Sequence, residues 1–361
     1  MADKDPLADV RKRIDKIDTT IQQLVSERAE CAAKVAEIKQ QQGDTGHFYR
    51  PEREAQVLQA VKDRNKGPLS DNAVAGIFRE IMAACLALEK PLKVAFLGPD
   101  GTYTHSASIK HFGSLFEKES VDSIEEVFRL VEADGADFGV VPVENSTEGV
   151  INHTLDLLMG SSLTICGEVE LRIRHNLLSS ETDLANIEHV YSHQQSLAQC
   201  RLWLDKYLPN AQRIATNSNA EAVQLTNKDK HSAAIAGIKA SELYGVPVLK
   251  SDIEDEPDNT TRFVIIGKHQ SPASGNDRTS LMVFAHNRPG SLFSLLEPLA
   301  KRDISMSNIE SRPSRKGVWE YVFFIDIDGH RDDDDVRTAI EEIEEASAMV
   351  TVLGSYPKAV I

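Results

Sequence analysis

Apolar residues in the first part of the chain recur every three or four positions, which is the spacing of one helix face. The pattern predicts a helix over residues 7–41, a second over residues 53–65 and a third that reaches Glu89. A helix as long as the first cannot bury its apolar stripe alone, so it requires partner helices or a second chain. We therefore predict an all-α module over residues 1–91. The stripe consists of Leu7, Val10, Ile14, Ile17, Ile21, Leu24, Val25, Val35 and Ile38.

Beyond Pro91, short apolar runs typical of strands alternate with helical patterns. This alternation predicts an α/β module with a largely parallel sheet over residues 92–268. Residues 269–278 are rich in Ser, Pro, Gly and Asn and are predicted to form a linker. The predicted strands cover residues 93–97, 138–143, 163–170, 188–192, 233–236 and 263–267.

Residues 279–361 have the pattern of a third module, in the βαββαβ order of ferredoxin-like domains. The acidic run Asp332–Asp335 is expected to start its second helix, because carboxylates favour the positive end of a helix dipole. A calcium loop is the alternative, although the EF-hand spacing is absent. The predicted strands cover residues 279–286, 304–310, 318–327 and 349–356, and the helices cover 291–302 and 333–347.

Composition and charge narrow the class of protein. The chain has 361 residues, 41% of them hydrophobic and 27% charged, as in ordinary globular proteins of two or three domains. No apolar stretch is long enough for a membrane helix, and a net charge of −16 argues against nucleic acid as a partner. The four cysteines are far apart without a CxxC motif, so we expect no metal site, no disulfide framework and a reducing, cytoplasmic location.

Two cations lie on the apolar face of the first predicted helix. Arg28 and Lys39 are eleven residues apart, which is close to three helical turns, so both point to the same side. Long basic side chains at helix interfaces often extend to water, and that is the alternative to a binding role. Glu89 closes the apolar face of the third helix, where desolvation would raise the pKa of its carboxyl group unless the side chain turns to water.

This segment resembles the all-helical chorismate mutase family over nearly all of residues 1–90, from Leu7–Arg11 to Tyr49–Glu54. The resemblance implies that two intertwined chains share each site, one chain supplying Arg11 and the other the remaining residues. It also implies a dicarboxylate substrate that rearranges in one pericyclic step, without nucleophile, metal or cofactor. Catalysis then rests on holding a reactive conformer and on donors to the ether oxygen. The implied catalytic residues are Lys39 and protonated Glu89, and the implied binding residues are Arg11, Arg28, Arg53 and Glu54.

The α/β module carries three polar clusters at the ends of predicted strands, at residues 144–149, 191–200 and 259–262. Open α/β folds bind ligands at such positions, although ordinary loop and helix-cap chemistry explains each cluster taken alone. The module lacks the GxGxxG, P-loop and GxSxG motifs. That absence argues against a nicotinamide dehydrogenase, a kinase and a serine hydrolase.

Together with Gly98–Tyr103 and His175–Leu178, these clusters resemble the prephenate dehydratase family over residues 93–267. The resemblance implies two lobes with a cleft between them, as in periplasmic binding proteins. It also implies a reaction that removes CO2 and the ring hydroxyl from prephenate and gives phenylpyruvate.

The same resemblance assigns roles to individual residues of the α/β module. Thr261 would act in hydroxyl loss and Arg262 would hold a carboxylate. His193 is a candidate general acid, with a structural role as the alternative. The residues expected to form hydrogen bonds with the substrate are Asn145, Ser192 and Gln199.

The last module contains Asn287–Leu292 at a strand-to-helix turn and Glu310–Pro313 at a strand end. These motifs resemble the ACT domain attached to prephenate dehydratases. The resemblance implies that phenylalanine binds between paired ACT domains, with its carboxylate on turn amides and its ring near Leu292. A purely structural dimerisation module is the alternative. The expected effector-binding residues are Gly290, Ser291, Leu292, Glu310, Ser311, Arg312 and Pro313.

Taken together, the three resemblances imply a bifunctional, cofactor-free enzyme of phenylalanine biosynthesis. It would convert chorismate to prephenate and prephenate to phenylpyruvate as a homodimer, under feedback inhibition by phenylalanine. One alternative is a mutase fused to a dehydratase that uses arogenate, an amino analogue of prephenate. Another is a non-catalytic ligand-binding regulator. The missing dinucleotide motif argues against a mutase–dehydrogenase fusion. Neither nucleic acid nor a membrane is expected as a partner.

Overall fold

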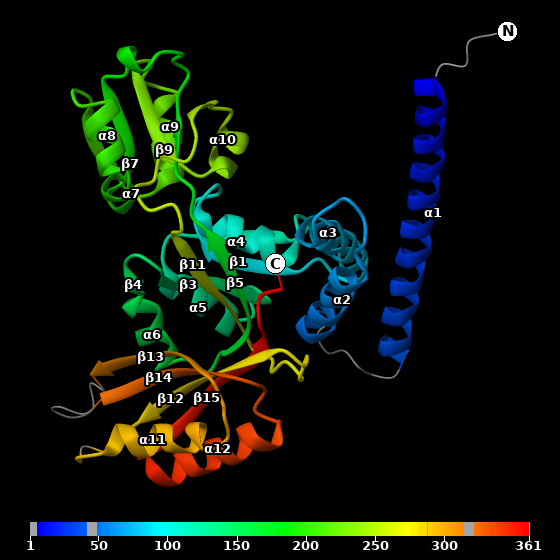
Figure 1. The fold of residues 1–361 in the computed structure, drawn as a ribbon, viewed down its shortest axis with the longest axis vertical. Coiled ribbons are helices and arrows are strands. Elements are labelled where there is room, and N and C mark those ends of the chain that lie inside the picture. Colours follow the sequence, from blue (N-terminus) through cyan, green and yellow to red (C-terminus); the bar gives the residue numbers. More distant parts are fainter. Residues whose placement is uncertain (1–5, 42–48, 287, 314–320, 361) are drawn as a thin grey trace.

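The computed structural model describes residues 6–41, 49–286, 288–313 and 321–360. Figure 1 shows three modules: a helical module on one side, an α/β module with two lobes, and a C-terminal module packed against the first lobe. The predicted sequence of an all-α module, a two-lobed α/β module and a βαββαβ module is therefore confirmed.

The helical module consists of α1 (Pro6–Gln41), α2 (Pro51–Arg64) and α3 (Asp71–Glu89). Pro51 starts α2 two residues earlier than predicted, because proline suits the first turn of a helix, where its missing N–H costs nothing. The Ser70 hydroxyl caps α3 by accepting a hydrogen bond from the N–H of Ala73 at 3.3 Å. α2 packs against α3, and α3 also packs against α1.

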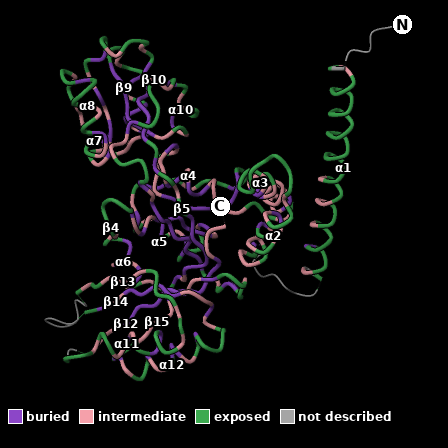
Figure 2. The backbone as a smooth tube through the Cα atoms, viewed as in Figure 1, coloured by how far each residue is buried: buried purple, intermediate pink, exposed green. Residues whose placement is uncertain are grey.

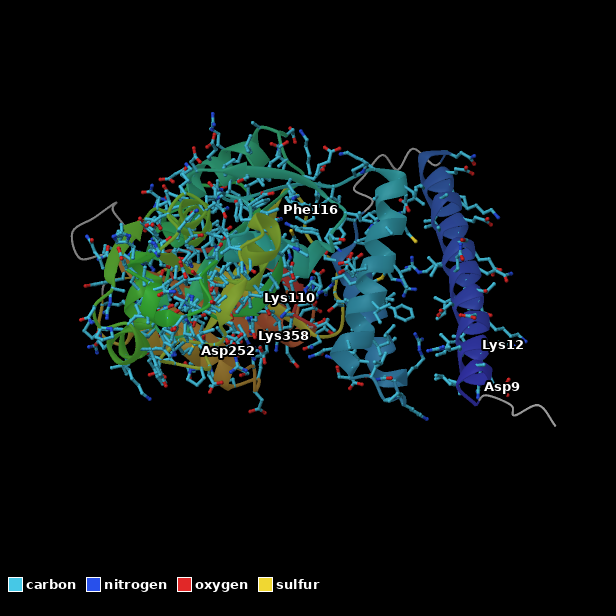
Figure 3. All side chains as sticks on the ribbon, turned by 90° about the horizontal axis from the view of Figure 1, so that it is seen from above. Asp9, Lys12, Lys110, Phe116, Asp252 and Lys358 are labelled. Atoms are coloured by element: carbon cyan, nitrogen blue, oxygen red, sulfur yellow. The ribbon has the colours of Figure 1, made fainter. Side chains whose placement is uncertain are left out.

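The apolar stripe of α1 is exposed along most of its length. Figure 2 shows α1 almost without buried residues, and Figure 3 shows it on the outer side of α3, away from the other modules. Eight apolar side chains of the stripe are 48–57% exposed. The prediction that this helix cannot bury its stripe alone is thus confirmed, and the packing against α3 leaves most of the stripe exposed. The eight are Leu7, Val10, Ile14, Ile17, Ile21, Leu24, Val35 and Ile38.

The first lobe of the α/β module is a sheet in the order β2-β1-β3-β11-β5, with the two-residue β4 (Gly149–Val150) beside β3. Helix α4 (Tyr103–Phe112) covers one face, and α5 (Ile124–Glu132) and α6 (Asn152–Leu158) cover the other. Its longer strands are β1 (Lys93–Leu97), β2 (Glu117–Val121), β3 (Phe138–Asn145), β5 (Thr164–Arg172) and β11 (Thr260–Gly267).

The second lobe is inserted between β5 and β11 and forms a separate sheet in the order β10-β6-β9-β7-β8. Its strands are β6 (Asn176–Leu178), β7 (His189–His193), β8 (Gln212–Thr216), β9 (Ser232–Ala236) and β10 (Val248–Lys250). Its helices are α7 (Gln194–Gln199), α8 (Arg201–Tyr207), α9 (Asn219–Thr226) and α10 (Ile238–Tyr244), with a short 3-10 turn at Leu184–Asn186.

The prediction of one largely parallel sheet is wrong. Both sheets are mixed: β1, β2 and β3 are parallel, but β11 runs antiparallel to both β3 and β5. In the second lobe β7, β8 and β9 are parallel, whereas β6 runs antiparallel to both of its neighbours, β9 and β10. The reason is that the chain leaves the first sheet after β5 and returns through β11 from the other lobe, so β11 enters from the opposite end.

The C-terminal module is an antiparallel sheet in the order β13-β14-β12-β15. Its two helices cover one face of the sheet. Asp333 lies at the N-cap position of the second helix without a side-chain cap bond, and Asp334 and Asp335 lie in its first turn, which confirms that the acidic run starts a helix. Its strands are β12 (Asp277–Phe284), β13 (Met306–Pro313), β14 (Tyr321–Asp328) and β15 (Met349–Pro357), and its helices are α11 (Ser291–Ala300) and α12 (Asp334–Ala346).

The other face of this sheet packs directly on the first lobe. Phe324 and Tyr356 share an apolar core with Val264. Gly354 lies so close to β5 that a Cβ would come within 1.9 Å of the Ile165 carbonyl oxygen. The predicted linker is itself packed, since the Ser271 hydroxyl donates to the Cys166 carbonyl. No helix in the described part of the chain is long and apolar enough to cross a membrane.

Candidate active sites and effector site

A cavity of about 750 Å³ lies between the two lobes of the α/β module. The first lobe contributes the turn before α4 and the inner ends of β3 and β11, and the second contributes α7 and the start of α9. No Lys or Arg is found among the described residues that line it. The polar lining residues used below are Tyr103, Asn145, His175, His193, Gln199, Asn219 and Thr261.

Asn145 and Thr261 form the centre of the first-lobe wall. The antiparallel register of β3 and β11 places them opposite each other, and the Asn145 Nδ2 donates to Thr261 Oγ1 at 2.8 Å. The same amide donates to Asn259 Oδ1 at 2.8 Å. Asn145 Oδ1 in turn accepts from Thr147, so the amide orientation is fixed on both sides. The predicted cluster at 144–149 and the one at 259–262 thus meet at one place.

Gln199 connects this wall to the second lobe. Its Oε1 accepts from His175 Nε2 at 2.8 Å and from Asn259 Nδ2 at 3.3 Å, while its Nε2 donates to Glu148 at 3.0 Å. Burial lowers the pKa of His175, even though the bond to Gln199 acts in the opposite direction. A neutral His175 with its proton on Nε2 fits this arrangement, and the Tyr103 hydroxyl lies 2.9 Å from its Nδ1.

Ser192 does not line the cavity, contrary to its predicted contact with the substrate. It is fully buried, and its hydroxyl lies within hydrogen-bond distance of Asn219 Oδ1 and of the Ile235 carbonyl. Its effect on the cavity is therefore to position Asn219, the first residue of α9. His193 does line the cavity, and its Nδ1 accepts from the N–H of Gln195, which caps α7.

Arg262 also lies outside the cavity, so the prediction that it holds a substrate carboxylate disagrees with the structure. Side chains alternate along a strand, and β11 turns Thr261 towards the cleft and Arg262 to the opposite face. There the guanidinium meets three carboxylates, with the shortest distance, 2.6 Å, to Asp326 of the C-terminal module.

Because no Lys or Arg is among the described lining residues, an anion in the cleft would meet backbone groups and polar side chains instead. Helices α4 and α9 both begin at the cavity wall, at Tyr103 and Asn219, and helix N-termini favour negative charge. The sequence prediction missed Tyr103, Asn219 and Asn259 as individual site residues. For Asn219 the sequence did contain a signal, namely the helix-start pattern Ser218–Glu221, in which Ser218 caps α9.

In the helical module, Arg28 and Lys39 of α1 face the end of α3. The Arg28 Nη1 lies 3.0 Å from the Cys85 sulfur. Burial raises the pKa of Glu89, and the nearby charge of Lys39 offsets part of the rise. Arg11 is seventeen residues before Arg28 on the same helix, which corresponds to about 25 Å along the axis. The Arg11 of the same chain therefore cannot reach this group.

Glu54 and Arg53 are not assembled with Arg28 in the described chain. Glu54 pairs with Arg79 of α3 at 3.1 Å, and Arg79 also donates to the Lys110 carbonyl in the α/β module. Burial raises the pKa of Glu54, and Arg79 offsets part of the rise. Arg53 is exposed. The predicted binding role of Glu54 thus competes with an ion pair at the interface between modules.

The predicted effector residues lie at two places in the C-terminal module. Gly290 has φ +82°, a left-handed conformation that favours glycine, and precedes α11. The Ser291 hydroxyl donates to backbone carbonyls of the same turn, and Leu292 is 40% exposed. On β13, Arg312 pairs with Asp156 of α6 at 2.6 Å. Glu310, Ser311 and Pro313 lie on the same strand, whereas Asn287 lies outside the described residues.

Comparisons with known proteins agree with this arrangement. Three family models match the modules in order: Chorismate mutase type II over residues 10–90, Prephenate dehydratase over 94–271 and ACT domain over 279–345. The fold and its cleft therefore define a two-domain enzyme with an appended ACT domain.

Curated relatives match the chain over nearly their full length. The chain is 52% identical over 365 residues to a bifunctional chorismate mutase/prephenate dehydratase of Pseudomonas aeruginosa, and the match covers 100% of both chains. It is 42% identical to the protein of that name from Aquifex aeolicus, with 98% of this chain and 99% of the relative covered. The chain belongs to the family of bifunctional chorismate mutase/prephenate dehydratases.

Solved structures match the α/β and C-terminal modules. The prephenate dehydratase of Arthrobacter aurescens in complex with L-Phe has a TM-score of 0.68 and 33% identity, covering 74% of this chain and 90% of that one. The prephenate dehydratase of Staphylococcus aureus has a TM-score of 0.65 and 29% identity, covering 73% and 100% of the two chains.

Proposed function

We propose that the cleft of the α/β module converts prephenate to phenylpyruvate. The observation that supports this assignment most directly is the hydrogen bond from Asn145 to Thr261 at the wall of the cleft. Because Thr261 Oγ1 accepts from Asn145, the proton of the hydroxyl is directed elsewhere, and among the described residues it has no acceptor. It can therefore donate to the departing hydroxyl of the substrate. Loss of hydroxyl and CO2 together then forms the aromatic ring.

Substrate orientation follows from the rest of the wall. Prephenate carries two carboxylates, and the N-termini of α4 and α9 lie at the cleft on opposite lobes. Each can take one carboxylate through backbone N–H groups. Gln199 spans the lobes by bonding Glu148 and His175, so closure of the cleft depends on it. Ser192 acts through Asn219.

This assignment is tested with purified protein and either prephenate or arogenate as the added compound. We expect phenylpyruvate from prephenate and a much slower reaction with arogenate. Turnover of arogenate alone would make the chain an arogenate dehydratase. If neither compound reacted and both bound, the binding-regulator alternative would replace the enzymatic one for this module.

We propose that the helical module rearranges chorismate to prephenate at a site shared by two chains. Arg28, Lys39 and Glu89 converge within one chain, and Arg11 lies too far away to join them unless a second chain supplies it. The exposed stripe of α1 supports such pairing, because a second copy of the helix would bury it. Lys39 and protonated Glu89 would stabilise the charge that develops on the ether oxygen.

Mutase activity is expected to fall as pH rises through the pKa of Glu89. Burial raises that pKa, and the protonated carboxyl is the form that donates, so the donor is lost on the alkaline side. Glu89→Gln keeps a donor at every pH and should flatten the profile of mutase kcat against pH. If the profile of this variant still matched that of the unsubstituted chain, Glu89 would be removed from the site.

We propose that phenylalanine binds the C-terminal module and inhibits the dehydratase. The prephenate dehydratase of Arthrobacter aurescens was solved in complex with L-Phe, and the match covers 74% of this chain and 90% of that one. The turn before α11 offers backbone groups for the carboxylate, and Leu292 offers an apolar contact for the ring.

Substitutions in the two effector motifs are expected to relieve inhibition. Gly290→Ala forces a side chain into a left-handed turn, and Ser311→Ala removes a hydroxyl from β13. Each should raise the phenylalanine concentration for half-inhibition by about tenfold. Dehydratase kcat without phenylalanine, measured in the same assay, should stay unchanged. Full inhibition at the original concentration in both variants would move the effector site elsewhere.

The module boundaries and the cytoplasmic location remain predictions made from the sequence. We propose domains at residues 1–91, 92–268 and 279–361, with the packed connection 269–278 between the last two. All four cysteines are free, which suits a reducing cytoplasm.

A further inference from the structure

The two strands that carry Asn145 and Thr261 also carry a charged pair on their other face. The register of β3 and β11 sets Arg262 opposite Glu144, one position along from Thr261 and Asn145. Because adjacent side chains on a strand point to opposite faces, this pair lies directly behind the wall of the cleft. A displacement of either charged residue therefore moves the backbone that places the wall.

Arg262 is fixed there by partners from two modules. Its guanidinium lies 3.3 Å from Glu144, 3.5 Å from Glu168 and 2.6 Å from Asp326, which belongs to β14 of the C-terminal sheet. The side chains of Arg262 and Asp326 are each only 10% exposed. Ser280 of the same sheet donates to the other oxygen of Asp326. A buried, charge-assisted contact of this kind is directional and is not screened by water.

A second ion pair joins the C-terminal module to α6, the helix that follows Asn145 in the chain. Arg312 of β13 donates to Asp156 Oδ1 at 2.6 Å and 3.2 Å. Asp156 lies on α6, the helix that follows the segment from Asn145 to Ile151, and both ends of that segment line the cleft. Arg312 belongs to the predicted effector motif. Its neighbour Glu310 lines the same small cavity as Arg262 and Asp326.

We propose that Arg262 is a positioning residue for the dehydratase step, and that the pairs Arg262–Asp326 and Asp156–Arg312 are the contacts through which the C-terminal module alters the placement of Thr261 and Asn145. The inference rests on the dehydratase and effector roles proposed above. One pair holds β11 and the other holds α6, so a shift of β13 and β14 acts on both catalytic segments at once. Coupling between two sites requires a structural element with two arrangements, and the ligands of both sites must shift the equilibrium between them.

The test uses the full chain with Asp326→Asn and Arg262→Lys, and with Glu342→Gln as matched control. Glu342 pairs with Arg302 inside the C-terminal module, so its loss removes an ion pair without touching the link. Dehydratase kcat and KM on prephenate are measured with and without saturating phenylalanine. Phenylalanine binding is followed by calorimetry, and mutase activity on chorismate reports that the chain is folded.

Asp326→Asn is expected to bind phenylalanine but to show an inhibition ratio about tenfold smaller than the unsubstituted chain. Arg262→Lys should lower kcat roughly tenfold and change KM by no more than about twofold. A lysine keeps the positive charge but cannot reproduce the contacts of the planar guanidinium with three carboxylates. Glu342→Gln should behave as the unsubstituted chain does. If Asp326→Asn fails to fold, Asp156→Asn removes the more exposed pair, and its inhibition ratio should fall in the same direction.

Full inhibition in folded Asp326→Asn and Asp156→Asn chains would overturn the coupling and leave the proposed function standing. A raised KM with unchanged kcat in Arg262→Lys would overturn the positioning role, because it would mean that Arg262 contacts substrate. If the unsubstituted chain neither converted prephenate nor bound phenylalanine, the proposed function would fail, and the coupling with it.

Discussion

Thr261→Val is expected to lower dehydratase kcat by about 10²–10⁴-fold, the usual contribution of a positioned proton donor. Valine has nearly the same shape, so the packing of β11 is kept while the hydroxyl proposed to donate to the departing group is lost. Asn145 retains its bond to Asn259, so the wall stays in place. The measurement is phenylpyruvate formation from added prephenate.

The neighbouring threonine provides the control for this variant. Thr260 precedes Thr261 on β11, and its hydroxyl donates to the Asp258 carbonyl. Thr260→Val should keep dehydratase kcat within about threefold, and both variants should keep mutase activity. Equal losses in the two variants, or no loss in Thr261→Val, would remove Thr261 from the chemistry.

Lys39→Met is expected to lower mutase kcat by about 10²–10³-fold, as the loss of one donor to a developing oxyanion does. Methionine keeps the unbranched stem of the side chain but has no charge or donor. Lys34→Met is the control, since Lys34 is an exposed cation on the same helix. Dehydratase activity on added prephenate should be unchanged in both. Mutase loss of the same size in Lys34→Met would mean that helix charge, and not the position of Lys39, matters.

The hydrophobic pattern of the sequence was sufficient to predict the helices and strands that bury apolar side chains. The predicted strand at 138–143 lies within β3, and the one at 233–236 lies within β9, because both are buried on two faces. The strand β2, with the sequence Glu-Lys-Glu-Ser-Val, was not predicted. It is a largely exposed edge strand that is held by its pairing with β1, so its side chains carry no apolar pattern.

The site residues were predicted where a strand end and a cluster of polar residues coincide, as at Asn145, Gln199 and Thr261. They were misplaced where a distant partner decides the direction of a side chain. The family resemblance implied that Arg262 holds a substrate carboxylate, but its partner Asp326 lies 64 positions away in the next module. Period-two alternation showed that the two side chains diverge, yet it could not show which face was the cleft.

We propose that one chain carries two successive active sites under control of its C-terminal module. The most direct test is to incubate the purified chain with chorismate alone and to follow chorismate, prephenate and phenylpyruvate, with and without phenylalanine. The account predicts that chorismate disappears, that phenylpyruvate forms without added cofactor, and that phenylalanine suppresses its formation. Untouched chorismate, or prephenate that accumulates without phenylpyruvate when no phenylalanine is present, would contradict it.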